Sequence, residues 1–115
     1  MNSPKLTDRA REAIQDPDSQ IFVSTISAYE IAFKYQQGKL RIPFGFLDNF
    51  EQNLREESFF SLPVTITHSL EAGKLIDEHR DPFDRILVGQ AIIEDLALVT
   101  IDEKITGFAG LSVLW

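Results

Sequence analysis

Hydrophobic and polar positions along the chain follow two alternating patterns, which predict helices and short strands in turn. Apolar residues that recur every three to four positions are typical of helices, which we expect over residues 8–15, 27–37, 47–57, 67–78 and 82–95, with a short helical turn at 102–106. Short runs of adjacent apolar residues indicate buried strands, which we expect over residues 21–25, 59–66, 96–101 and 111–114.

Residues with capping and turn chemistry mark several of the predicted element ends. Thr67 is the expected N-cap of the fourth helix, and Asp81 followed by Pro82 predicts a cap with proline at the first helical position. Gly38 follows the second helix, where a left-handed residue is favoured. Pro63 lies within the second strand and has no amide donor, so we expect this strand at an edge of the sheet.

The order of the elements predicts the fold class. Strands that alternate with helices form a mainly parallel sheet covered on both faces, because parallel neighbours need crossover connections. We therefore expect an α/β fold with three layers, α/β/α, in a single domain over residues 1–115. Ligands of such sheets bind beyond the carboxyl ends of the strands. Glu30 follows the first predicted strand and Asp102 follows the third, so both carboxylates are expected at this edge.

Composition and charge narrow the classes of function. The absence of cysteine excludes a disulfide scaffold, a thiolate zinc site and a cysteine nucleophile. No apolar run approaches the ~20 residues of a membrane span, and we expect a cytoplasmic protein with no membrane partner. The net charge of −7 argues against binding nucleic acid by overall charge. A polyphosphate substrate would therefore need a cation held by carboxylates.

Asp84 is the most informative of these acids. It lies in the first turn of the predicted helix 82–95, which is apolar on nearly all sides, and a buried carboxylate needs a cation or several donors. The alternative is an acid that interacts with the helix dipole and pairs with Arg80 or Arg85. For Asp81, an N-cap role alone is sufficient.

Two further acids also have ordinary structural explanations. Glu30 has the spacing to form a capping box with Ser27 and an ion pair with Lys34, although its neighbours are apolar. Asp102 can cap the turn at residues 102–106, and Thr100 brings a hydroxyl to the same end of the strand. Together, three acids at one edge of the sheet form an oxygen ligand set suited to Mg²⁺ or Mn²⁺. Such an ion would support hydrolysis of phosphodiester bonds.

Other residue types give weaker indications. His68 and His79 have no third ligand at zinc spacing, and we expect them at the surface or behind the metal ligands. Tyr29, Phe33 and Tyr35 share one predicted helix, and we expect them to pack there; the alternative is a platform on which bases stack.

Three segments of the chain resemble PIN-domain proteins of the VapC-like toxin group. They are VSTISAYEIAFK at residues 23–34, HRDPFDRILVGQA at 79–91 and LVTID at 98–102, and HRDPFDR is the most specific. The likeness extends over residues 3–115. It implies the toxin of a type II toxin–antitoxin pair, a magnesium-dependent endoribonuclease that acts on RNA and is held inactive by a small antitoxin protein.

The resemblance also implies roles for individual residues. Glu30, Asp84 and Asp102 match the acids that bind the metal, and Thr100 matches the hydroxyl that accompanies the last of them. Asp81 matches a position with a structural role. Arg85 matches a residue that orients an acid or contacts phosphate.

The sequence departs from the family pattern at its beginning. Family members start with an apolar strand, central in the sheet, that ends in a metal-binding Asp, and this sequence begins after that unit. Either the start lies upstream of Met1, or the protein is shortened and its site is impaired. In the second case the gap in the sheet predicts a homo-oligomer. The alternative function is then a remnant that binds an antitoxin or a sister toxin through helices 27–37 and 47–57.

A phosphoacceptor receiver domain is a third possibility on the ground of the fold. It requires a pair of acids early in the chain, and this sequence has no such pair.

Overall fold

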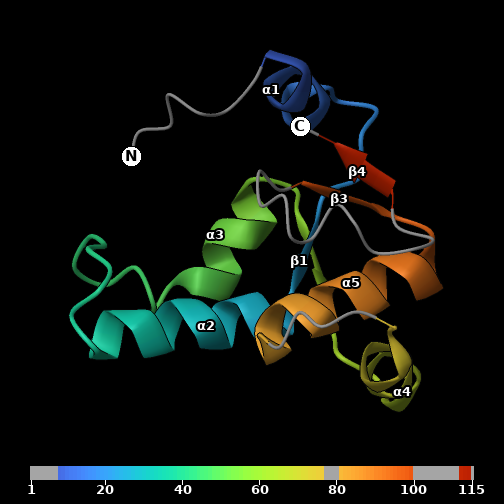
Figure 1. Ribbon diagram of the computed structural model, residues 1–115. Coiled ribbons are helices and arrows are strands. Elements are labelled where there is room, and N and C mark those ends of the chain that lie inside the picture. The colour runs from blue at the N-terminus through green and yellow to red at the C-terminus, as the bar shows by residue number, and fades with distance from the viewer. Residues whose placement is uncertain (1–7, 77–80, 100–111, 115) are drawn as a thin grey trace. The chain divides into compact units, whose positions relative to one another are not determined.

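The protein is described by a computed structural model for residues 8–76, 81–99 and 112–114. The chain, drawn in Figure 1, divides into two compact units. The middle unit comprises residues 20–63, and the terminal unit comprises residues 1–19 and 64–115.

The middle unit is a βααβ segment with a parallel strand pair. Its elements are β1 (Phe22–Ser24), α2 (Thr25–Gln36), α3 (Phe50–Glu56) and β2 (Phe60–Leu62). β1 pairs with β2 in parallel, with Phe22 opposite Phe60 and Ser24 opposite Leu62. The rings of Phe22 and Phe60 pack with centroids 5.4 Å apart. The two helices thus form the crossover that a parallel pair requires.

α2 begins directly at the end of β1, two residues before the predicted start. Ser24 is the N-cap, and its hydroxyl oxygen accepts a hydrogen bond from the amide of Ile26 at 3.1 Å. The predicted capping box between Ser27 and Glu30 is therefore wrong, because both residues already lie within the helix. An extended serine serves as both the last strand residue and the cap, so no loop separates the two elements.

α2 ends as the glycine signal predicts. Gly38 has a φ of +74°, and its amide donates to the carbonyl of Tyr35 at 3.0 Å. The amide of Lys39 donates to the carbonyl of Lys34 at 2.9 Å. These two bonds form a Schellman motif, which satisfies the last helical carbonyls and turns the chain sharply.

A second ordered turn precedes α3. The amide of Phe46 donates to the carbonyl of Pro43 at 3.1 Å, and Gly45 has a φ of +80°. A positive φ at the third residue is characteristic of a type II turn. The side-chain amide of Asn49 also donates to the carbonyl of Gly45 at 2.9 Å. Further turn residues follow as far as Asn49, so α3 starts at Phe50 instead of residue 47.

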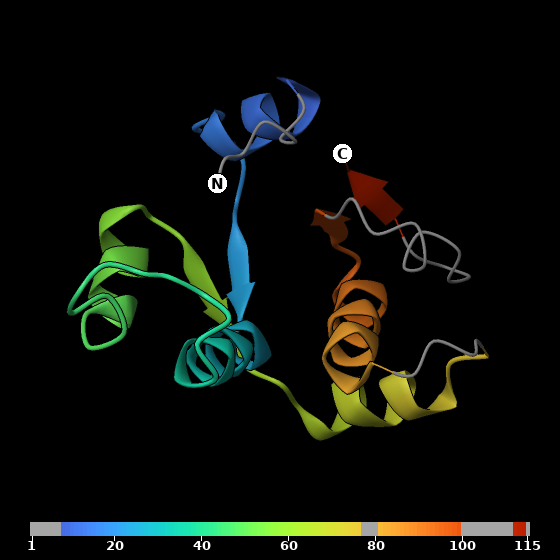
Figure 2. The ribbon, with the colours of Figure 1, turned by 60° about the vertical axis from the view of Figure 1, so that its left-hand side comes forward.

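The terminal unit contains three helices and the other strand pair. Its elements are α1 (Asp8–Gln15), α4 (Ile66–Lys74), α5 (Pro82–Glu94), β3 (Ala97–Val99) and β4 (Ser112–Leu114). β3 and β4 are parallel, as predicted. α4 and α5 pack against each other (Figure 2), and Val88 of α5 is completely buried with Leu75, Ile92 and Leu98 around it. Among the described residues, every helix is too short or too polar to span a bilayer.

Gly89 of α5 lies against the backbone of α4. A Cβ atom at this position would lie 2.9 Å from the carbonyl oxygen of His68 and 3.0 Å from the amide nitrogen of Ala72. The backbone of α5 therefore lies close to His68 and Ala72 of α4 at this point, and position 89 has no room for a side chain.

The cap of α4 differs from the prediction. Thr65, not Thr67, is the N-cap: its hydroxyl oxygen accepts from the amide of His68 at 3.2 Å. The amide of Thr65 in turn donates to Nδ1 of His68 at 3.0 Å, which completes a capping box. The predicted surface position of His68 is also wrong, because the side chain is buried and its Nε2 donates to Glu94 at 2.8 Å. His79 lies outside the described residues.

The strands are shorter than the predicted ranges but occur in the same four places. All described pairing is parallel, which agrees with an α/β fold. The pairing within the described residues forms two sheets of two strands, so the single three-layer domain stays a prediction. The predicted turn at residues 102–106 lies outside the described residues.

Candidate functional site

The amino-terminal end of α5 holds Asp84 in a defined position. Asp81 is the N-cap, as predicted: its Oδ1 accepts from the amides of Phe83 at 3.0 Å and Asp84 at 3.5 Å. Pro82 occupies the first turn, where its missing amide costs nothing. Asp84 lies half-buried in this turn. The positive end of the helix dipole stabilises a carboxylate at such a position.

Arg85 fastens the end of α4 to α5. Its Nη2 donates to the carbonyl of Ala72 at 2.9 Å and to the carbonyl of Leu75, also at 2.9 Å. These are among the last carbonyls of α4, which have no partner within the helix. The guanidinium therefore has a capping role that the sequence did not indicate. Arg80, the other cation considered beside Asp84, lies outside the described residues.

Glu30 forms the ion pair that its spacing predicts. One carboxylate oxygen lies 2.9 Å from Nζ of Lys34, one helical turn further along α2. The Glu30 side chain is 21% exposed and that of Lys34 is 51% exposed. A pair in such partial contact with water contributes little net stability.

The predicted metal ligands are distributed over different parts of the chain. Glu30 belongs to the middle unit and Asp84 to the terminal unit, whereas Thr100 and Asp102 lie outside the described residues. Within residues 8–76, 81–99 and 112–114, no group of three or more His, Asp or Glu side chains is placed to hold a metal ion. The metal site of Glu30, Asp84 and Asp102 thus stays a prediction.

The aromatic side chains of α2 do not pack as predicted. Tyr29, Phe33 and Tyr35 are 57%, 42% and 47% exposed. Tyr29 and Phe33 instead stack on each other, with ring centroids 6.0 Å apart and an angle of 12° between the planes. α2 therefore carries an aromatic surface that remains accessible.

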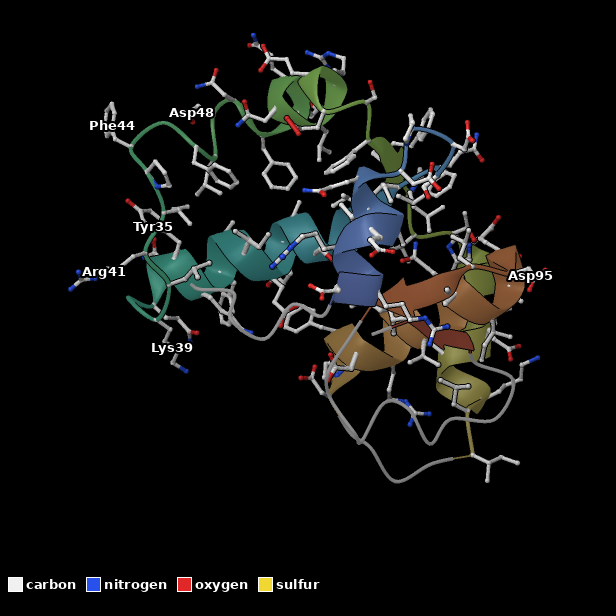
Figure 3. All side chains as sticks on the ribbon, turned by 90° about the horizontal axis from the view of Figure 1, so that it is seen from above. Tyr35, Lys39, Arg41, Phe44, Asp48 and Asp95 are labelled. Atoms are coloured by element: carbon white, nitrogen blue, oxygen red, sulfur yellow. The ribbon has the colours of Figure 1, made fainter. Side chains whose placement is uncertain are left out.

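A second accessible group at the end of α2 was not identified from the sequence. Lys39, Arg41 and Phe44 are exposed in the segment after the helix, close to Tyr35 in the chain (Figure 3). The sequence does contain a signal for it: residues 31–47 contain three basic residues and no acidic one, although acids outnumber bases 18 to 11 in the whole chain. The negative net charge of the whole chain conceals this local excess of basic residues.

Comparison with known proteins identifies the family. The PIN domain matches residues 1–111, which is nearly the whole chain. Neither the curated proteins nor the solved structures contain a match. The α/β composition and the parallel strand pairs agree with the family assignment. The chain therefore belongs to the PIN-domain family, whose members are in general metal-dependent nucleases.

Proposed function

We propose that this protein is a metal-dependent endoribonuclease, the VapC-like toxin of a type II toxin–antitoxin system. The observation that carries the proposal is the PIN-domain match over residues 1–111. It is supported by Asp84, which the cap of α5 holds in the first turn of a largely buried helix. The likeness of residues 79–85 to the toxin group narrows the class from nuclease to toxin.

The chemistry of the donor set fits Mg²⁺ or Mn²⁺. Glu30, Asp84 and Asp102 offer only carboxylate oxygens, which are the ligands that these hard cations prefer. Bound there, the cation would supply a Lewis acid that neutralises charge on the phosphate and acidifies water. The Thr100 hydroxyl would orient a carboxylate or water by hydrogen bonding. Asp81 keeps Asp84 in place, and Arg85 keeps α4 and α5 together.

The second candidate function is a PIN-domain remnant that binds an antitoxin or a sister toxin without cleaving RNA. The exposed stack of Tyr29 and Phe33 favours it, because solvent-exposed aromatic pairs are typical of surfaces that a partner protein covers. The ion pair of Glu30 with Lys34 also favours it, since a metal has to displace the lysine. Both functions predict an antitoxin as partner, and only the first predicts cleavage.

The substitution Asp84→Asn tests the enzyme. It keeps the size of the side chain and removes the charge, so we expect metal-stimulated RNA cleavage to fall at least about 100-fold, as for loss of a group that acts on the reacting phosphate. The matched control is Asp95→Asn, which removes one exposed carboxylate at the left-handed C-cap of α5, where asparagine is well tolerated. Unchanged cleavage by Asp84→Asn would refute the proposed mechanism.

Metal binding gives an independent readout. A cation held only by the folded protein raises its stability by about 2.7 kcal/mol at a hundredfold excess over the dissociation constant. We expect Mg²⁺ or Mn²⁺ to raise the melting temperature of the parent protein, and Glu30→Gln or Asp84→Asn to reduce this increase. Glu51→Gln, at an exposed acid in the first turn of α3, serves as control. Absence of both the increase and the cleavage in the parent would support the remnant.

A further inference from the structure

One short segment of the middle unit has a charge opposite to that of the protein. Residues 31–47 form the longest stretch without Asp or Glu, and they contain Lys34, Lys39 and Arg41. Lys34 is engaged by Glu30. Lys39 and Arg41 are exposed, and within the described part of the chain no ion pair involves either of them. Two cations are thus presented to solvent on a protein with a net charge of −7.

The backbone fixes where these two cations project. The Schellman motif at Gly38 sets the direction of the chain as it leaves α2, and the amide of Lys39 is part of that motif. Residues 39–42 then alternate, with Lys39 and Arg41 exposed and Leu40 and Ile42 half-buried. Both basic side chains therefore lie on the exposed side of this segment. Figure 3 shows both projecting away from the unit.

An aromatic ring is presented beside them in an equally fixed way. Phe44 occupies the second position of the type II turn and is fully exposed. Gly45 and Asn49 hold this turn through the positive φ and the side-chain hydrogen bond. Tyr35, nearly half exposed in the last turn of α2, adds a second ring at the same end of the unit. We call Tyr35, Lys39, Arg41 and Phe44 the cationic tip.

We propose that the cationic tip binds single-stranded RNA. Lys39 and Arg41 would contact phosphates, and Phe44 and Tyr35 would stack against bases, the combination by which proteins hold unpaired strands. An acidic protein repels RNA elsewhere, so a local patch of this kind determines where the strand can lie. The proposal rests on the proposed function in that it names a surface for the same substrate, outside the predicted metal ligands. An acidic protein partner would need the two cations but not a ring at the apex of a turn.

The charge part of the proposal is tested by binding, without cleavage. Fluorescence anisotropy with a labelled short oligouridylate in EDTA measures affinity of the full chain over a range of salt concentrations. We expect the double substitution Lys39→Gln with Arg41→Gln to weaken binding at least about tenfold. The slope of log affinity against log salt should fall by about 1.4, because each phosphate contact on a single strand contributes about 0.7.

The matched control removes two exposed charges from the terminal unit. Lys74→Gln with Arg11→Gln changes the net charge equally, so it should leave the salt slope within error of the parent. Equal losses in the two double variants would overturn the proposal, because overall charge would then account for binding. An unchanged affinity in the Lys39 and Arg41 variant would overturn it as well.

The aromatic part is tested with Phe44→Ala. Loss of one stacked ring should weaken binding on the order of 5- to 100-fold with an unchanged salt slope. Ile76→Ala is the control, since Ile76 is an equally exposed apolar side chain in the other unit. If Phe44→Ala has no effect and polyglutamate competes as well as the oligouridylate, the tip is a site for an acidic protein and the RNA proposal is wrong.

A substitution of opposite sign completes the test. Asp48 is the first acid after the acid-free stretch and is exposed next to the turn of Phe44 (Figure 3). Asp48→Asn should therefore tighten RNA binding, and Asp95→Asn, with the same change in charge, should not. The binding results are independent of cleavage: loss of binding by the tip variants with normal metal response supports the proposal, whereas failure of Asp84→Asn to reduce cleavage concerns only the nuclease mechanism.

Discussion

Two glycines in neighbouring helices have opposite roles. Gly89 of α5 faces the backbone of α4, where a Cβ atom would meet the carbonyl oxygen of His68 at 2.9 Å. Gly73 of α4 has no atom within 4 Å of the position that a Cβ would take. Helix propensity favours alanine over glycine at either site by up to about 1 kcal/mol. The space available for a Cβ atom therefore decides whether alanine raises or lowers the free energy of unfolding at each position.

We expect Gly89→Ala to lower the free energy of unfolding by about 1–3 kcal/mol, because backbone atoms on α4 cannot move aside as a flexible side chain can. Gly73→Ala should raise it by up to about 1 kcal/mol. Urea denaturation of both variants measures the difference. A Gly89→Ala protein as stable as the parent would show that the two helices are not in backbone contact.

The role of Arg85 could be predicted from the sequence only in part. Its place in the HRDPFDR segment predicts a role near the acids. The structure adds two hydrogen bonds to carbonyls of α4 at 2.9 Å. These partners lie 10 and 13 residues away, and they become neighbours only through the packing of α4 on α5. No local pattern around Arg85 contains that information.

At the scale of elements, the starts of α2 and α4 show what determines which residue becomes the N-cap of a helix. Ser27 and Thr67 are the caps expected from the sequence, and each has another serine or threonine two or three residues before it. The structure selects Ser24 over Ser27 and Thr65 over Thr67. In both cases the earlier residue is extended and follows or ends a strand. Propensity alone does not distinguish the candidates, because the end of strand pairing decides where the chain is free to turn.

The threonine pair gives a direct prediction. Thr65→Ala removes the hydroxyl that accepts from the amide of His68, and it should lower the free energy of unfolding by about 1 kcal/mol. Thr67→Ala lies within the first turn, where alanine is the better helix former, and should have an effect of no more than about 0.5 kcal/mol. Thermal denaturation followed by circular dichroism measures both. A larger loss of stability in Thr67→Ala than in Thr65→Ala would show that Thr67 is the N-cap.

Elements with unambiguous end signals were predicted well. α1 has the predicted bounds, and α5 begins at its Asp81 cap and ends within one residue of the predicted range. At the candidate site, the cap at Asp81 and the ion pair of Glu30 with Lys34 follow from local spacing. The role of Glu30, Asp84 and Asp102 as metal ligands stays a prediction. The buried contact of His68 with Glu94 and the exposure of the α2 aromatics depend on tertiary packing.

At the scale of the whole molecule, the strand pairing is relevant to whether copies of the chain associate with one another. Within the described residues, β1 pairs only with β2 and β3 only with β4, and each strand has three residues. Strand edges that have no partner within the described residues can pair with a strand of a second chain.

We accordingly expect the purified chain to form a homo-oligomer. Light scattering coupled to size exclusion should give a mass of at least two chains, with dissociation on dilution. A monomer at all concentrations, together with a sharp thermal transition, would contradict this expectation, since the strand edges would then be satisfied within one chain.

The backbone contact at Gly89 bears on how this protein can be regulated. At Gly89 the backbone of α5 lies against His68 and Ala72 of α4, so at this point there is no free space through which one helix could shift toward the other. Asp84 belongs to the same helix as Gly89, and Asp81 and Arg85 secure its first turn. We therefore expect an inhibitor protein to act by obstructing access to Asp84, because the tight packing at Gly89 opposes movement of α5 against α4.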